Sequence, residues 1–260
     1  MNIILNSPNG LVVEDVKQSK NVIIDKNSTD YGYYDVFAPG RDDDYMITDD
    51  DFCKLAQMQK KYIHIEPMLK NEIERDIAQI IGTEKVLAVH ARGADAQIHY
   101  ANHPIPIGID KYIEETEKSL KLIGANKVFL ATDDNNILKA FIDKYKENLI
   151  YYKDVERSDG VRMSCYGDVQ REKHHYRLGK EIIKDVYTLA ACTGLVCSAS
   201  YVSYMAKIVK MASGQTFQTV NSISSVKREK GMNLTDPLTI KKVETLWNQE
   251  LKSAGKGEWK

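Results

Sequence analysis

The chain has 260 residues, of which 36 are basic and 37 are acidic, so its formal net charge is −1 at pH 7. This balance lacks the basic excess that nucleic-acid binding uses, and we expect no nucleic-acid partner. No apolar stretch approaches the length of a membrane span, and residues 1–6 lack the features of a signal peptide, so we expect a cytoplasmic protein. The four cysteines form no Cys-x-x-Cys pair, which predicts reduced core thiols rather than a metal site.

The beginning of the chain has a mixed pattern. Three short apolar runs predict strands, at residues 2–5, 11–16 and 21–25. The acidic clusters at 42–44 and 49–51 lack the glycine that a calcium loop needs at its sharp bend. We therefore interpret them as solvated loop, with Asp49 or Asp50 capping the next helix.

Two helices are expected next, at residues 51–62 and 67–81. Pro67 suits the first position of the second helix, because its missing N–H would be unpaired there anyway. The residues expected along the buried face of this helix are Met68, Ile73, Ile77 and Ile80.

From residue 85 onward, apolar strands alternate with amphipathic helices. The expected strands are 86–91, 127–132, 149–152, 194–198 and 216–221. The expected helices are 109–123, 137–145, 178–189, 201–211 and one that opens at Asp236-Pro237. This alternation predicts an α/β fold with a doubly wound parallel sheet. We divide the chain into a small N-terminal region, 1–84, and a sheet domain, 85–260. The polar segment 157–176 is longer than a simple connecting loop in a compact domain, so we expect it to be functional or mobile.

Residues suited to ligand binding follow three of the expected strands. They are His90, Arg92 and Gly93 after the first, Asp133 and Asp134 after the second, and Ser198 and Ser200 at the end of the fourth. Because the carboxyl ends of parallel strands meet at one edge of a sheet, these residues should converge on one ligand crevice. A guanidinium pairs with diphosphate, a carboxylate accepts two hydrogen bonds from guanine, and a helix N-terminus holds phosphate. The pattern predicts a nucleoside-diphosphate site without a bound metal.

Each of these residues also has a structural interpretation. Asp134 or Asn135 can cap the helix that follows, and Ser200 can cap the next one. A histidine before a loop is more often structural than catalytic. The convergence on one sheet edge is what favours the binding interpretation. The chain has no G-x-G-x-x-G after a strand and no P-loop signature, which argues against a dinucleotide fold and a P-loop site.

Four motifs together resemble the successive motifs of the fucosyltransferase superfamily, which includes α1,6-, bacterial nodulation and protein O-fucosyltransferases. The motifs are His90-Ala-Arg92-Gly93-Ala-Asp95, His103-Pro104, Phe129 to Asp134, and Asp185 with Leu195 to Ser200. Their order and spacing match over about residues 84 to 225. The resemblance implies a GT-B fold of two facing α/β domains, a GDP-fucose donor, inversion at the anomeric carbon and no need for a divalent metal.

The resemblance also implies roles for individual residues. The implied contacts to guanosine are His90, Asp133 and Asp134, and those to the diphosphate are Arg92, Ser198 and Ser200. Gly93 is also among the implied nucleotide-sugar-binding residues. Arg92 is also the implied catalytic residue. Asp185 lies on the helix before the last motif, and we expect it to be structural.

The general base departs from the family pattern. The α1,6 enzymes place an acidic candidate base shortly before the His-Pro pair, but residues 97–102 contain no acid. His99 is the local substitute, because a neutral imidazole can accept a hydroxyl proton near pH 7. A base from residues 1–84 or 157–176 is an equal alternative. Arg157 and Arg162 of the latter segment can add phosphate contacts, or be solvated loop charges.

The family's acceptor domain is expected to be abbreviated or truncated here, because only about 85 residues precede the first motif. We predict an inverting, metal-independent glycosyltransferase that moves fucose from GDP-fucose to a glycan or oligosaccharide hydroxyl, in polysaccharide biosynthesis. One alternative is a glycosyltransferase that uses another GDP-sugar. The other is a non-catalytic nucleotide-binding protein with a degenerate acceptor half.

Overall fold

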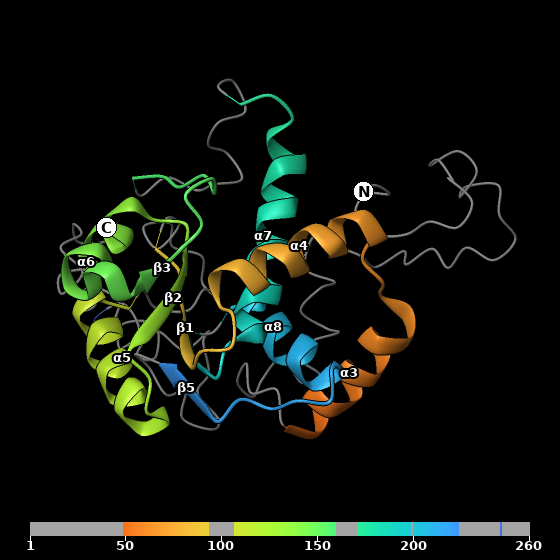
Figure 1. Ribbon diagram of the computed structural model, residues 1–260, viewed down its shortest axis with the longest axis horizontal. Helices are drawn as coiled ribbons and strands as arrows, with labels where there is room; N and C mark the ends of the chain where they lie inside the picture. Colours follow the sequence, from red (N-terminus) through yellow and green to blue (C-terminus); the bar gives the residue numbers. More distant parts are fainter. Residues whose placement is uncertain (1–48, 94–106, 160–170, 199, 224–244, 246–260) are drawn as a thin grey trace, which may run out of the picture.

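The computed structural model of the protein describes residues 49–93, 107–159, 171–198, 200–223 and 245 (Figure 1). Its elements are α3 (Asp49–Tyr62), α4 (Pro67–Ile80), β1 (Val86–Ala91), α5 (Ile109–Ile123), β2 (Lys127–Thr132), α6 (Asn135–Tyr145), η1 (Lys146–Asn148), β3 (Leu149–Ile150), α7 (His174–Ala191), β4 (Gly194–Ser198), α8 (Tyr201–Ala212) and β5 (Thr219–Ile223). None of the helices in these ranges combines the length and the apolar character that crossing a bilayer requires.

The five strands form one sheet in the order β3-β2-β1-β4-β5, and every neighbouring pair is parallel. β1 is the central strand, and all six of its residues are buried. Its side chains alternate between two cores, since Leu87 and Val89 belong to one and Val86 and Ala88 to the other. An unbroken apolar run is what a strand covered on both faces needs. The predicted α/β fold with a doubly wound parallel sheet is confirmed.

The helices cover both faces of the sheet (Figure 1). On one face, Tyr112 and Ile123 of α5 and Phe141 of α6 pack on the strands. On the other, Leu189 of α7 and Ala206 of α8 fill the core. Ile77 and Ile80 of α4 pack against this second core, so the last helix before residue 85 shares its interior with the sheet.

α3 packs against α8, where Phe52 and Ala56 meet Ile208. The helix begins at Asp49, so Asp49 and Asp50 lie in its first turn, and the prediction that one of them precedes the helix as its cap is wrong. In the first turn their negative charges still interact favourably with the positive end of the helix dipole.

Other details differ from the sequence prediction. Met68 was expected to be buried but is 79% exposed, and Leu69 occupies the inward position instead. β3 has two residues rather than four, and β5 begins at Thr219 rather than at residue 216. Cys192 and Cys197 are buried free thiols as predicted, whereas Cys53 is exposed. The strands expected before residue 49, Cys165 and most of the C-terminal helix lie outside the described residues.

The turn after β1 packs tightly on the start of α6. A Cβ atom added at Gly93 would lie 2.7 Å from each of Asp134 Cβ, Asp134 Oδ2 and Ile137 Cδ1. Such distances are far below van der Waals contact, so only glycine fits at this position. This close approach joins the ends of β1 and β2 into one surface.

Replacing Gly93→Ala should therefore destabilise the protein by about 1–3 kcal/mol, the usual range for an overpacked core. Part of the loss should be recovered when Ile137→Val removes the clashing Cδ1 atom, so the double variant should lose less than the sum of the singles in urea unfolding. Gly124→Ala is the control, because its added Cβ meets nothing within 4 Å and should show no coupling to Ile137→Val. Strict additivity of Gly93→Ala with Ile137→Val would contradict the packing described.

Candidate functional site

The order of the strands reverses between β1 and β4, because the chain builds β2 and β3 on one side of β1 and then crosses to β4 and β5 on the other. In an open parallel sheet, this switch point is where the ligand crevice lies, outside the carboxyl ends of the strands. Arg92 and Gly93 follow β1 here, while Ser198 ends β4 and Ser200 precedes α8. Residues that are about 100 positions apart in the sequence therefore share one edge.

A cavity of about 300 Å³ opens at this edge. The predicted site residues His90, Arg92, Asp133 and Ser200 all line it. The remaining lining residues are Thr132, Val155, Glu156, Leu178, Glu181, Ile182, Asp185, Tyr201 and Val202. Gly93, Asp134 and Ser198 are not part of its wall, and His99 lies outside the described residues.

His90 is buried at the end of β1, with 7% of its surface exposed. Its Nδ1 lies 2.8 Å from the Oγ atom of Ser203 on α8. Burial, together with the nearby Arg92 guanidinium, lowers the pKa of His90 to about 3. The imidazole is therefore neutral at physiological pH, and Arg92 supplies the positive charge at this end of the cavity.

The two aspartates after β2 have different surroundings. Asp133 Oδ1 accepts a hydrogen bond of 2.9 Å from the Gly93 backbone N–H, which ties the ends of β2 and β1 together. Asp134 is 1% exposed and is the N-cap of α6, where its Oδ1 accepts from the Asn136 N–H at 2.7 Å. The capping interpretation of Asp134 is thus correct, and Asp133 is the member of the pair at the cavity.

The serines after β4 also differ. Ser200 occupies the N-cap position of α8, but its side chain makes no capping hydrogen bond. Ser198 is buried and hydrogen-bonded to the phenol of Tyr112, which also bonds to the backbone of Arg92. Tyr112 of α5 therefore links the two turns that flank the switch point. Burial raises the pKa of the Tyr112 phenol, so it stays protonated.

Asp185, which was expected to be structural, also lines the cavity. It lies on α7 and lines the cavity together with Leu178 and Ile182. Ile182 is four residues after Leu178, and Asp185 is three residues after Ile182, so the three side chains share one face of the helix. Loss of hydration raises the pKa of Asp185 to about 7, and the cation of Arg157 only partly offsets this. The signal in the sequence was an acid on the apolar stripe of a helix, where an unpaired carboxylate is costly.

Arg157 does not have either predicted role. It is 8% exposed, and its Nη1 and Nη2 atoms donate to the carbonyl oxygens of Val155 and Tyr152 at 2.9 and 3.0 Å. It is thus neither a solvated loop charge nor part of the cavity wall. It holds the segment after β3 in place beside Asp185. Arg162 lies outside the described residues.

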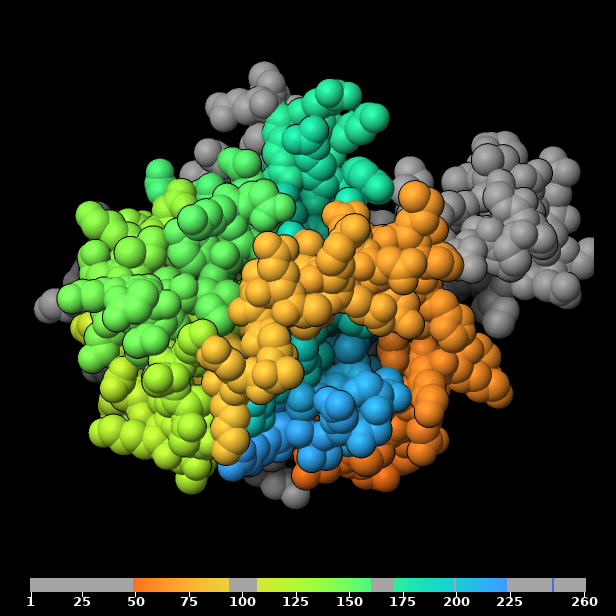
Figure 2. All heavy atoms as spheres, in the orientation of Figure 1, coloured from red at the N-terminus to blue at the C-terminus, as the bar shows by residue number. Residues whose placement is uncertain are grey.

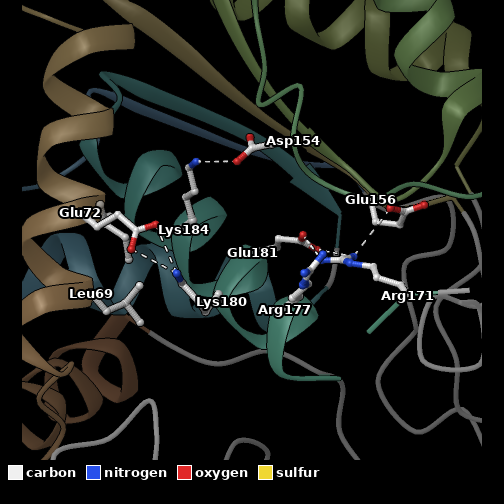
Figure 3. Close-up of a pocket in the computed structure, with 10 residues that line it drawn as sticks. Leu69, Glu72, Asp154, Glu156, Arg171, Arg177, Lys180, Glu181 and Lys184 are labelled. Carbon is white, nitrogen blue, oxygen red and sulfur yellow. Dashed lines mark hydrogen bonds and ion pairs between the residues drawn. The ribbon is translucent and has the colours of Figure 1, made fainter. Parts of the chain in front are cut away.

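A second, larger cavity of about 400 Å³ lies between α4, α7 and the segment after β3 (Figure 3). Its charged side chains are largely paired with one another, since Arg171 contacts Glu181 and Glu156, and Lys180 contacts Glu72. Two ion pairs, Lys180–Glu72 and Lys184–Asp76, join α7 to α4, which crosses in front of α7 in the space-filling view (Figure 2). The two cavities share Glu156 and Glu181, but only the smaller one is lined by residues at the strand ends, so we place the functional site there.

The described ranges contain no group of three or more His, Cys, Asp or Glu side chains placed to bind a metal ion.

No protein-family model matches the chain, and neither does any curated protein sequence. Solved structures do show similarity. NodZ alpha-1,6-fucosyltransferase co-crystallised with GDP is 15% identical with a TM-score of 0.40, and the match covers 58% of this chain and 43% of that one. Fucosyltransferase NodZ from Bradyrhizobium is 14% identical with a TM-score of 0.39, covering 58% and 44%. POFUT1 in complex with GDP is 13% identical with a TM-score of 0.44, covering 68% and 51%. The chain thus spans about half the length of these fucosyltransferases.

Proposed function

We propose that this chain is an inverting glycosyltransferase that uses GDP-fucose and transfers fucose to a hydroxyl group of a glycan or oligosaccharide. In this proposal residues 85–260 bind the donor, residues 1–84 face the acceptor, and no divalent metal is needed. The supporting observation is that an arginine, a helix N-terminus and a desolvated carboxylate meet in one cavity at the carboxyl edge of the sheet. A nucleoside diphosphate is a ligand that presents both an anion and a polar base edge.

The diphosphate is assigned to the end of the cavity formed by Arg92 and the start of α8. A guanidinium donates two parallel hydrogen bonds to phosphate oxygens. Ser200, Tyr201 and Val202 bring the N-terminus of α8 to the cavity wall, and the first N–H groups of a helix bind anions. The Ser200 hydroxyl is not used for capping, which makes it a further donor. Gly93 and Ser198 support this end from behind, through Asp133 and Tyr112.

The guanine base is assigned to the part of the cavity formed by α7 and the segment after β3. Val155, Leu178 and Ile182 offer apolar walls for a flat ring. Asp185 adds a carboxylate, which can accept the N1–H and the exocyclic amine of guanine through its two oxygens. Asp133 is the alternative acceptor, and Asp134 would act indirectly by fixing the turn at Gly93.

The proposed transfer is a single displacement. The acceptor oxygen forms its bond to the anomeric carbon while the bond from that carbon to the β-phosphate oxygen breaks, and the electron pair leaves with GDP. Arg92 would stabilise the negative charge that grows on the departing diphosphate. A general base takes the proton of the acceptor hydroxyl, and His99 remains the candidate within the family motif. We also propose a cytoplasmic location and a role in polysaccharide synthesis.

Arg92→Lys and Arg92→Ala should both reduce kcat/KM for GDP-fucose by about 30- to 1,000-fold, equivalent to roughly 2–4 kcal/mol of transition-state stabilisation. Lysine should not rescue activity, because a point charge cannot replace a planar fork of donors. The measurement is release of GDP in the presence of a panel of glycan acceptors and GDP-sugars. Arg75→Ala, an exposed arginine on α4, is the control and should behave like the natural protein.

Near-normal activity of Arg92→Lys would contradict the assignment of the diphosphate. A preference for another GDP-sugar in the donor panel would favour the first alternative function. Tight GDP binding without transfer or hydrolysis in any combination would favour a nucleotide-binding protein.

Affinity for GDP should rise with pH as Asp185 ionises, because only the carboxylate accepts both guanine hydrogen bonds. The pKa of Asp185 in the empty cavity is about 7, so affinity should reach its plateau above that pH and fall by up to about tenfold per unit below it. The phosphate of GDP also titrates in this pH range. IDP carries the same diphosphate and lacks only the exocyclic amine of guanine, so the phosphate titration cancels in the ratio of GDP affinity to IDP affinity. This ratio should be about tenfold at pH 8 and shrink towards pH 6.

Asp185→Asn should lower the ratio of GDP to IDP affinity and abolish its pH dependence in calorimetric titrations. The matched control is Asp143→Asn, which changes an exposed acid on α6. An unchanged ratio in Asp185→Asn would move the base contact to Asp133, for which Asp133→Asn is the corresponding test.

A further inference from the structure

The two ring nitrogens of His90 have different surroundings. Nδ1 is 2.8 Å from Ser203 Oγ, and this hydrogen bond is buried on both sides, since His90 is 7% and Ser203 0% exposed. His90 also lines the cavity at the switch point, whereas Ser203 lies one turn further along α8 and does not. Because Nδ1 is engaged with α8, Nε2 is the nitrogen left for a ligand in the cavity.

A neutral imidazole carries one proton, so the direction of the Nδ1 hydrogen bond decides what Nε2 can do. If Ser203 donates to Nδ1, the proton is on Nε2, which becomes a donor. If Nδ1 donates to Ser203, Nε2 is a bare acceptor. Burial and Arg92 keep His90 neutral by lowering its pKa to about 3, so a doubly protonated ring is not a third option at physiological pH.

The second neighbour of Ser203 decides between these directions. The Cys197 thiol of β4 is hydrogen-bonded to both Ser203 and Ser222, and burial raises the pKa of this thiol, so it remains protonated. A thiol sulfur is a weak acceptor, whereas the lone pair of an imidazole nitrogen is a good one. The proton of Ser203 therefore favours Nδ1 of His90 over the sulfur of Cys197, which has the hydroxyl of Ser222 as a second partner.

We infer that Ser203 donates its hydroxyl proton to Nδ1 of His90 and so fixes the tautomer whose Nε2–H group donates into the cavity. Ser203 is then a positioning residue that acts through His90 and makes no contact with ligand. An uncharged donor suits an oxygen acceptor, whereas the other tautomer would place a lone pair against that oxygen. For the ligand, this inference rests on the proposed function: the acceptor is an oxygen of GDP, either on a phosphate or at the base carbonyl.

The tautomer can be read directly from ¹⁵N-resolved NMR spectra of the imidazole rings in the full chain without ligand. The imidazole signals that disappear in His90→Gln are assigned to His90. The natural protein should show Nε2–H, Ser203→Ala should show a mixture of tautomers, and Ser203→Thr should retain the natural pattern because it keeps the hydroxyl. Ser119→Ala, a buried serine on α5, is the matched control and should leave the ring unchanged. A natural protein protonated at Nδ1, or an unchanged ring in Ser203→Ala, would overturn the inference.

Calorimetry with GDP then tests the consequence for binding. Ser203→Ala should weaken GDP binding by about three- to tenfold, the value of one hydrogen bond, while Ser203→Thr and Ser119→Ala stay near the natural affinity. The same loss with guanosine would identify the base carbonyl as the acceptor, and a loss with GDP alone would identify a phosphate oxygen. Undiminished GDP affinity in Ser203→Ala would overturn the role of Ser203. If the natural protein binds no GDP, the proposed function fails, and the NMR spectra still decide the tautomer.

Discussion

Parallel pairing of β1 with both β2 and β4 is the constraint on which the rest of this structure depends. Each parallel crossover returns the chain to the same end of the sheet, so the turns after β1, β2 and β4 must collect at one edge. The tight contact between Gly93 and Asp134 and the links made by Tyr112 then hold these turns together. The cavity follows from this arrangement, because helices diverge on either side of the point where the strand order reverses.

Removal of water sets the charge of four titratable groups at or near the cavity. It keeps His90 neutral, Tyr112 and Cys197 protonated, and Asp185 poised to ionise near pH 7. Arg92 keeps its charge, because a guanidinium stays protonated in proteins. The described wall of the cavity also contains the acids Asp133, Glu156, Glu181 and Asp185, so the positive charge is confined to the end formed by Arg92 and the start of α8.

The sheet edge at which the cavity opens was predictable from the sequence, whereas the contacts of individual residues were only partly so. The motif that ends β1 and the aspartates after β2 identified this edge, because an apolar run followed by polar residues marks a strand end. The different positions of Asp133 and Asp134 could not be predicted from the sequence, since both residues follow the same strand. Only the packing against Gly93 shows which of the two is buried. Asp185 was expected to be structural because it lies on a helix with an apolar stripe, and Met68 was misplaced because α4 presents Leu69 to the interior instead.

The sequence by itself determined the elements, the parallel sheet and the strand ends that carry the candidate site residues, because these depend on hydrophobic periodicity and on residues close together in the chain. Only the tertiary structure decided which side chains line the cavity, which charges survive burial, and that α8 bonds to His90 through Ser203. Those properties arise from contacts between residues as far apart as positions 90 and 203. Such contacts depend on how helices pack on the sheet, and local patterns in the sequence do not contain that geometry.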